Sequence, residues 1–179
     1  WGESYDREVT EVFAIQRELT SSLVSFFQLD LTSEEKQRLA HNTTNSLVAY
    51  DHFQEGQRQS RNQTKETNEE ASKSYRKAIE TDPDYGRAYG ALAYSLALAF
   101  RRGWTDAPVE TLDQALVLAR KGVELDNTVP QTHWALGYVY LMRQELENAE
   151  KATSRAIYVS PSYADGYGLL ALINNNMGH

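Results

Sequence analysis

The sequence contains no cysteine, only two methionines and four prolines, and no long apolar run. Without cysteine the chain cannot form disulfides or thiolate metal sites, which fits a reducing compartment. The longest apolar run, Ala91 to Phe100, is interrupted by Ser95 and has about half the length that a bilayer span requires. We therefore expect no membrane span and a cytoplasmic protein.

An excess of basic residues is also missing. Lysine and arginine number 18 against 25 aspartates and glutamates, for a formal charge of -7. Such a balance gives no broad cationic surface for nucleic acid or for an anionic membrane. Residues 1–6 have neither the basic start nor the apolar core of a signal peptide. We expect no nucleic-acid partner, and we expect the chain to be part of a longer protein.

Motifs of common enzymes do not occur in the sequence. It has no phosphate-binding Gly-Lys-Thr loop, no zinc-binding His-Glu-x-x-His pair and no Gly-x-Ser-x-Gly nucleophile elbow. The four histidines are dispersed, and adjacent carboxylates such as Glu69 and Glu70 lie where they complement a helix dipole. The sequence predicts a protein that is not an enzyme, with no cofactor, no metal and no catalytic residue. His133 is expected to have a half-buried structural role.

Three alanine-rich segments resemble one another. From Asn127 to Pro161 the step is 34 residues, and from Pro83 to Asn127 it is 44, which is one such period plus ten. A period in this range indicates stacked helical hairpins. The three segments contain Ala71 and Ala78, Ala115 and Gly122, and Ala149 and Ala156.

Apolar spacing predicts the helices before the repeats. From residue 6 to 29 the apolar residues recur three or four apart, which predicts a helix of about six turns. Thr32 and Glu35 form a capping-box pattern, which predicts a short helix over residues 33–40. The polar residues 41–45 then separate a leading segment, residues 1–43, from a repeat region, residues 44–179.

The repeat region is expected to contain three hairpins and part of a fourth. The first begins near Ser46, and its second helix opens at Thr67; residues 57–66 are either a solvated loop or a polar extension of the first helix. The second covers residues 86–125, where Asp106 is expected to cap the helix that Pro108 helps to start. The third covers residues 130–159, and the fourth begins near Tyr163.

These repeats resemble the tetratricopeptide repeat family. The family pattern of a large residue, Leu-Gly, Tyr, Ala, Ala and Pro is matched best by His133, Leu136, Gly137, Tyr140, Ala149, Ala156 and Pro161. The chain departs from it at Thr153, which replaces a bulky residue, at Asn127, which replaces a turn proline, and at Gln54, which replaces a small one. The resemblance implies an all-α fold: a right-handed superhelical solenoid of antiparallel helix pairs, here preceded by a long N-terminal helix that packs against the first hairpin.

The leading segment, from Tyr5 through Phe13 to Thr32, resembles a second pattern. It is similar to the junction at which a TolB-like domain leads into tetratricopeptide repeats in bacterial regulators of the adenylate-cyclase type. This resemblance implies the regulatory carboxy-terminal part of a larger signalling protein.

The first helix of each hairpin lines the concave face in such a solenoid, so spacing predicts the inward residues. An aromatic groove with an arginine and amides at its edges suits a protein or an extended peptide. The alternative is that Trp134 and Tyr138 only pack between hairpins. The predicted partner-binding residues are Arg87, Tyr94, Trp134, Tyr138, Met142, Asn175 and Asn176, with Leu98, Asp51, Glu55 and Arg58 on the same face.

Two further features bear on partners. The connector that contains Arg101, Arg102 and Trp104 is either a contact loop or a segment whose tryptophan folds back on its own hairpin. Asp51 and Glu55 would repel the acidic tails of heat-shock chaperones, so we do not expect such tails to bind.

The last helix lacks a partner helix within this sequence, so we expect an exposed apolar strip on it, which could mediate homo-oligomers. The sequence therefore favours a non-enzymatic protein-binding scaffold. The alternative is a structural or oligomerising arm of a cyclase-type enzyme whose catalytic domain lies outside this sequence.

Overall fold

The structure is a computed structural model that describes residues 12–28, 32 and 43–178. In these ranges the regular secondary structure is entirely α-helical, as the sequence predicts. No helix among the described residues is long and apolar enough to cross a membrane. The helices are α1 (Val12–Phe26), α3 (Leu47–Ser60), α4 (Lys65–Thr81), α5 (Gly86–Arg101), α6 (Pro108–Leu125), α7 (Pro130–Met142), α8 (Leu146–Val159) and α9 (Ala164–Met177).

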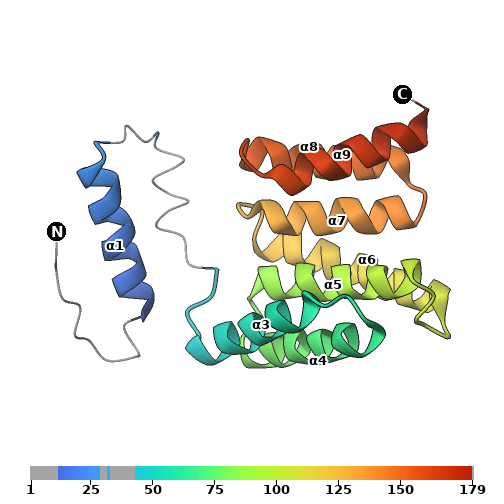
Figure 1. The fold of residues 1–179 in the computed structure, drawn as a ribbon, viewed down its shortest axis with the longest axis horizontal. Helices are drawn as coiled ribbons and strands as arrows, with labels where there is room; N and C mark the ends of the chain where they lie inside the picture. The colour runs from blue at the N-terminus through green and yellow to red at the C-terminus, as the bar shows by residue number, and fades with distance from the viewer. Residues whose placement is uncertain (1–11, 29–31, 33–42, 179) are drawn as a thin grey trace.

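Consecutive helices from α3 onward form antiparallel pairs that stack into a solenoid. The pairs α3–α4, α5–α6 and α7–α8 have the most extensive contacts, and α5, α7 and α9 contact one another in succession. Figure 1 shows the first pair at one end of the stack and α8 and α9 at the other. The predicted hairpin boundaries at Gly86, Leu125, Pro130 and Val159 are confirmed.

Helix starts follow the polar residues around them, with two corrections to the predicted caps. Ser46 caps α3, since its hydroxyl accepts a hydrogen bond from the Ala49 amide at 3.2 Å. The predicted start of α4 at Thr67 is wrong, because Thr64 is the N-cap and forms a reciprocal capping box with Thr67. Asp106 does not cap α6 either. Ala107 is the N-cap, and Pro108 occupies the first turn as predicted.

The polar stretch of residues 57–66 combines both structures that the sequence allows. α3 continues to Ser60, so the first part extends the helix, and a short turn then leads to α4. Gln63 closes this turn with a φ of 50°. The chain therefore reverses within four residues, which keeps α3 and α4 side by side.

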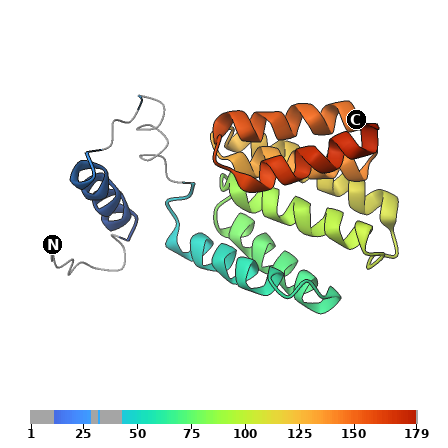
Figure 2. The same cartoon turned by 45° about the horizontal axis from the view of Figure 1, so that its top comes forward.

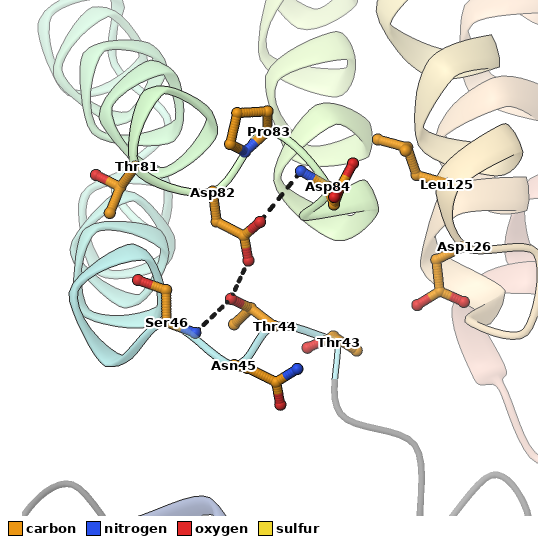
Figure 3. Close-up of a pocket in the computed structure, with 10 residues that line it drawn as sticks. All are labelled: Thr43, Thr44, Asn45, Ser46, Thr81, Asp82, Pro83, Asp84, Leu125 and Asp126. Carbon is orange, nitrogen blue, oxygen red and sulfur yellow. Dashed lines mark hydrogen bonds between the residues drawn. The ribbon is translucent and has the colours of Figure 1, made fainter.

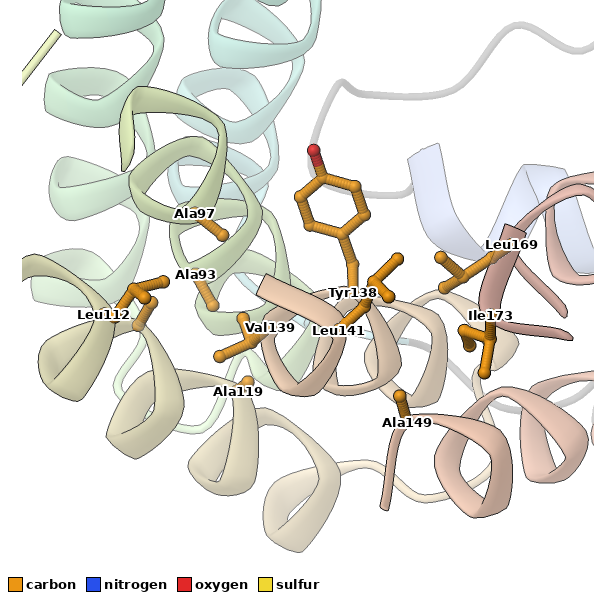
Figure 4. Close-up of a cluster of buried hydrophobic side chains, with 11 residues drawn as sticks. Ala93, Ala97, Leu112, Ala119, Tyr138, Val139, Leu141, Ala149, Leu169 and Ile173 are labelled. Carbon is orange, nitrogen blue, oxygen red and sulfur yellow. The ribbon is translucent and has the colours of Figure 1, made fainter. Parts of the chain in front are cut away.

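Small residues at the helix contacts let the backbones approach closely. Ala71, Ala93 and Ala149 have no exposed surface. In the first hairpin Gln54 stands where the family pattern has a small residue. Gly56, two residues later, provides the close approach instead, since it faces the Tyr75 ring and a Cβ there would lie 2.5 Å from Cε1. Figure 4 shows the buried cluster that α5, α6, α7, α8 and α9 form together. A second cluster joins α3, α4 and α5.

The described part of the leader helix, α1, does not pack on the first hairpin, contrary to the prediction. α1 lies apart from the stack in both views (Figures 1 and 2). The first hairpin already covers its largest apolar side chain, Phe53, with the rings of Tyr75 and Tyr85 at 5.7 and 5.2 Å between centroids. On α1, Phe26 is 60% exposed. The predicted helix over residues 33–40 and the start of the leader helix lie outside the described residues.

Candidate functional site

Three aromatic rings from α5 and α7 meet on the inner face of the solenoid. Tyr94 of α5 lies 5.0 Å from Trp134 and 5.0 Å from Tyr138 between ring centroids. The Trp134 and Tyr138 rings stack at 5.6 Å with 19° between their planes. They come together because Trp134 and Tyr138 are one helical turn apart and α7 packs directly on α5. We call these three residues the aromatic cluster.

A cavity of about 300 Å³ opens beside the aromatic cluster. Residues of α3, α4, α5 and α7 line it, together with the start of α9, so it spans all four repeats. We call this cavity the groove. Its main wall residues are Phe53, Tyr75, Arg87, Tyr94, Trp134 and Asp165. The mixture of large rings with a few polar groups is typical of a surface that binds another molecule.

Arg87 supplies a positive charge at one end of the groove. Its guanidinium lies 5.0 Å from the centroid of the Phe53 ring, which is cation–π geometry. Among the residues that the structure describes, Arg87 forms no ion pair with a carboxylate. Its side chain is therefore held in place by an aromatic ring while its charge remains available to a ligand.

Arg101 lies at the other end of the aromatic cluster. It donates a hydrogen bond from Nη1 to the Tyr138 hydroxyl at 3.3 Å, and this bond raises the pKa of Arg101. Burial raises the pKa of the neighbouring Tyr94 hydroxyl, although Arg101 and Arg102 oppose that shift. In Figure 4 the Tyr138 ring extends away from the aliphatic side chains around it. The phenol thus bridges the buried core and an exposed cation.

Trp134 is fixed by a contact to the fourth repeat. Its indole Nε1 donates to the Asp165 carbonyl oxygen at 3.0 Å. The Tyr163 hydroxyl lies close by, and its pKa is raised, first by burial and second by the Asp165 carboxylate. The wall that α9 contributes is therefore polar and locally acidic.

The structure brings together only part of the set that the sequence predicts for the concave face. Arg87, Tyr94 and Trp134 line the groove, and Tyr138 stacks on its edge. Met142 packs against the core cluster instead. Asn175 and Asn176 are exposed near the end of α9, away from the lining residues, and Asn176 donates to the Leu172 carbonyl oxygen of its own helix at 2.7 Å.

The other residues that the sequence predicts to face inward lie in different environments. Leu98 is buried, while Asp51 is exposed. Glu55 forms an ion pair with Arg58 one turn away. Sequence reasoning missed the groove residues Phe53, Gln57, Tyr75, Tyr163 and Asp165. Of these, only Phe53 had a usable signal, because it lies on the apolar face of the first predicted repeat helix.

The connector after α5 turns back toward its own helix. The Trp104 amide donates to the Ala99 carbonyl oxygen at 2.9 Å, and Gly103 adopts a φ of +67°. Such a positive φ favours glycine because it has no Cβ. Arg102 is exposed and Trp104 is half-buried. The contact of Trp104 with a partner stays a prediction.

A second cavity, of about 470 Å³, lies at the start of α3 and the turn after α4 (Figure 3). The Thr44 hydroxyl donates to the Asp82 carboxylate, and that carboxylate also accepts from the Asp84 amide at 3.1 Å. The first bond joins the two loops, and the second is internal to the turn after α4. Among the described residues no group of three or more potential ligands could hold a metal ion. The acidic side chains here therefore have a structural explanation.

His133 is buried in the third repeat, where its Nε2 lies 3.0 Å from the Asn127 carbonyl oxygen. Burial lowers its pKa, and the hydrogen bond to Asn127 partly opposes that shift. At 6% exposure, with Nε2 at a backbone carbonyl, the imidazole offers little access to a reacting group. The sequence-based interpretation as a structural residue fits this geometry.

Solved structures with the same architecture identify the fold. The chain is similar to the first TPR domain of Spaghetti (RPAP3), solved with an HSP90 peptide, at 18% identity and a TM-score of 0.57 over 78% of this chain and 100% of that one. The chain has the tetratricopeptide-repeat fold. The first TPR domain of human RPAP3 is similar at 18% identity and a TM-score of 0.55, over 73% and 93% of the two chains. A C-terminal TPR-containing domain from Plasmodium falciparum matches at 19% identity and a TM-score of 0.50, over 83% and 95%.

One curated protein is similar in sequence. It is putative adenylate cyclase 3 of Rhizobium meliloti (strain 1021), 29% identical over 152 residues, which are 85% of this chain and 26% of that protein. The chain thus spans about a quarter of this relative. The match fits the resemblance of the leading segment to regulators of the adenylate-cyclase type. No protein-family model matches the chain.

Proposed function

We propose that this tetratricopeptide-repeat chain binds a protein segment or an extended peptide in the groove and does no chemistry of its own. The observation that carries the proposal is the groove itself, in which rings from three successive hairpins surround a cavity of about 300 Å³ with an arginine in its wall. Rings contribute contact area at low entropic cost, and Gln57 and Gln131 on the walls offer amides to a peptide backbone. The similar RPAP3 domain was solved with a peptide bound, which supports this use of the fold.

The setting that we propose is a larger bacterial signalling protein in the cytoplasm. Similarity to a named adenylate cyclase over a quarter of its length supports this setting. In such a protein the repeats would recruit a partner, and a separate part of the chain would do the catalysis. The absence of membrane-spanning helices in the described residues is compatible with this arrangement.

A test compares peptide binding by two groove variants and one control. Fluorescent peptides from a random library are selected on the parent chain, and their affinities are measured by anisotropy. Trp134→Ala removes a wall ring, whereas Ala91→Leu fills the cavity without removing a core group. Tyr158→Ala, which truncates a residue that is 68% exposed on α8 and does not line the groove, is the matched control.

We expect both groove variants to weaken binding at least about tenfold, as interface anchors do, and the control to bind as the parent does. Melting temperatures establish that each variant is folded. Equal binding by all four proteins would refute a peptide site in the groove.

The second candidate is a structural arm that joins copies of the parent protein. It is favoured by the apolar side chains that α9 leaves exposed: Tyr167 is 49% and Leu172 is 39% exposed, and Ala171 beside them is also exposed. Mass in solution across concentration tests this alternative. A tight dimer that Tyr167→Ala dissociates, together with no peptide bound by the parent, would favour the arm over the peptide site.

A further inference from the structure

Two arginines and a tyrosine between them recur at a regular interval on the inner face of α5. Arg87, Tyr94 and Arg101 are each seven residues apart, which is close to two helical turns. All three therefore lie on nearly the same side of the helix. With a rise of 1.5 Å per residue, Tyr94 lies about 10 Å from each arginine along the axis, and the two arginines are about 21 Å apart.

Other residues hold both arginines at this face. Arg87 lies over the Phe53 ring, and Arg101 donates to the Tyr138 hydroxyl. Neither forms an ion pair with a carboxylate among the described residues. By contrast, Arg143 elsewhere in the solenoid contacts two carboxylates, those of Asp113 and Glu145. In a chain of net charge -7, α5 thus presents two unmatched cations on either side of an aromatic centre.

This spacing matches an extended chain. A polyproline-II-like peptide advances about 3.1 Å per residue with three residues per turn, so three residues cover about 9 Å, six cover about 19 Å, and side chains three residues apart point to the same side. A segment that runs along α5 would place its first and seventh side chains at Arg87 and Arg101 and its fourth at the aromatic cluster. Because the pattern is the same from both ends, it accepts either chain direction.

Nearby acidic groups limit how much negative charge the groove accepts. Asp165 lines the groove as Arg87 does, and the two form no ion pair with each other among the described residues. Asp51 is exposed on the first repeat. A cluster of adjacent carboxylates would approach these groups and be repelled, whereas one carboxylate at each end meets one arginine.

We propose that the groove, together with the adjoining surface at Arg101, recognises an extended segment with one acidic residue at each end of a seven-residue stretch and an aromatic or large aliphatic residue in the middle. This inference rests on the proposed function, since it names the class of ligand for the same groove. It identifies the partner by the pattern acid, two residues, apolar, two residues, acid.

The experiment measures the binding of four labelled peptides to the 179-residue chain by fluorescence anisotropy. The matching peptide is acetyl-Glu-Ser-Ala-Phe-Ala-Ser-Glu-amide. One control replaces both glutamates by lysine, and a second keeps the composition but places the two glutamates next to each other at one end. A third replaces phenylalanine by serine.

The protein variants are Arg87→Gln and Arg101→Gln, with Arg155→Gln as the control of equal charge change. Arg155 lies over the Tyr158 ring at 4.7 Å on α8 and does not line the groove. We expect Arg87→Gln to weaken the matching peptide about tenfold, and Arg101→Gln, which is more exposed, about threefold. Added salt should weaken binding by the parent and narrow these differences. Arg155→Gln should bind as the parent does.

Several results would overturn the inference. Equal affinity for the peptide with adjacent glutamates or with lysines would show that the spacing and sign of charge are not recognised. An equal effect of Arg155→Gln would assign the loss to net charge alone. If these peptides fail but the library-selected peptides bind in the groove, the ligand class is wrong and the proposed function stands. If no peptide of either kind binds, both fall.

Discussion

A single methyl group at Gly137 should disturb the packing of the third hairpin. Gly137 lies in α7 where that helix meets α8, and an added Cβ would overlap the Thr153 hydroxyl. It would also lie 3.3 Å from the Ala149 carbonyl oxygen and 3.3 Å from the Thr153 amide nitrogen. Thr153 has no exposed surface, so its side chain has little room to move. Gly137→Ala should therefore force the two helices apart or strain the Thr153 rotamer.

The expected magnitude follows from two opposing effects. Overpacking of a well-filled core costs about 1–3 kcal/mol. Alanine in place of glycine within a helix stabilises it by about 1 kcal/mol when the methyl meets no obstacle. The net result should be a loss of up to about 2 kcal/mol. For a chain of this size that lowers the melting temperature by up to about 8 °C.

The assay is denaturant unfolding followed by far-UV circular dichroism, with Gly168→Ala as the matched control. Gly168 is also in a helix, α9, and a Cβ there meets nothing within 4 Å. Gly168→Ala should leave stability unchanged or raise it. If Gly137→Ala proves as stable as Gly168→Ala, the close approach of α7 and α8 is not what requires glycine.

A second substitution tests the cause of the loss. Thr153→Ala removes the atom that the new methyl would overlap, and the Thr153 hydroxyl has no hydrogen-bond partner among the described residues. The double variant should be less destabilised than the sum of the two single variants by about 1 kcal/mol, because the clash is absent in it. Additive losses would place the strain on the backbone contact with Ala149 instead.

The shifted pKa values of His133 and Tyr85 predict how the stability of the fold depends on pH. Burial lowers the pKa of His133 below its usual 6.5, so the unfolded chain takes up a proton before the folded chain does, and stability should fall as pH drops below about 6.5. His133→Gln should reduce this fall in the free energy of unfolding between about pH 7 and about pH 5.5, measured by denaturant unfolding at each pH. An unchanged dependence on pH would contradict the assignment to His133. Burial raises the pKa of Tyr85 to about 12, so stability should be lost as pH rises from about 10 to about 12, where only the unfolded chain releases the proton. Tyr85→Phe should reduce that alkaline loss at little cost near neutral pH, because the phenol hydroxyl has no hydrogen-bond partner of good geometry among the described residues; a large loss at neutral pH would mean that Thr43 does bond to it.

Periodic features of the solenoid were predictable because they depend on contacts close in sequence. The alanines at Ala71, Ala115 and Ala149 recur at one position in the second helix of each hairpin, and all three are fully buried. The starts of α5 and α7 at Gly86 and Pro130 follow from the same local pattern. The helix-capping rules failed at the start of α4, because Thr64 and Thr67 are both suitable N-cap residues and lie three residues apart.

The groove was predictable only on the helices whose period the sequence displays. Tyr94 and Trp134 follow from the repeat register, and so does Arg87. Tyr163 precedes α9, and Tyr75 lies on the second helix of its hairpin, which the pattern assigns to the outer layer. Tyr75 faces the groove because Gly56 of α3 leaves room for its ring, and no spacing rule expresses such a contact between two helices.

The sequence by itself determined the all-α repeat architecture, the hairpin limits and the aromatic residues of the inner face, since helical period and small-residue spacing are local properties of the chain. The tertiary structure decided which of those residues share a cavity. It separated Asn175 and Asn176 from the groove and joined Arg87 to Phe53 and Arg101 to Tyr138. It also left α1 without the predicted contact to the first hairpin. The physical reason is that these outcomes depend on how far one hairpin is displaced and turned relative to the next, which side-chain volumes at distant positions determine together.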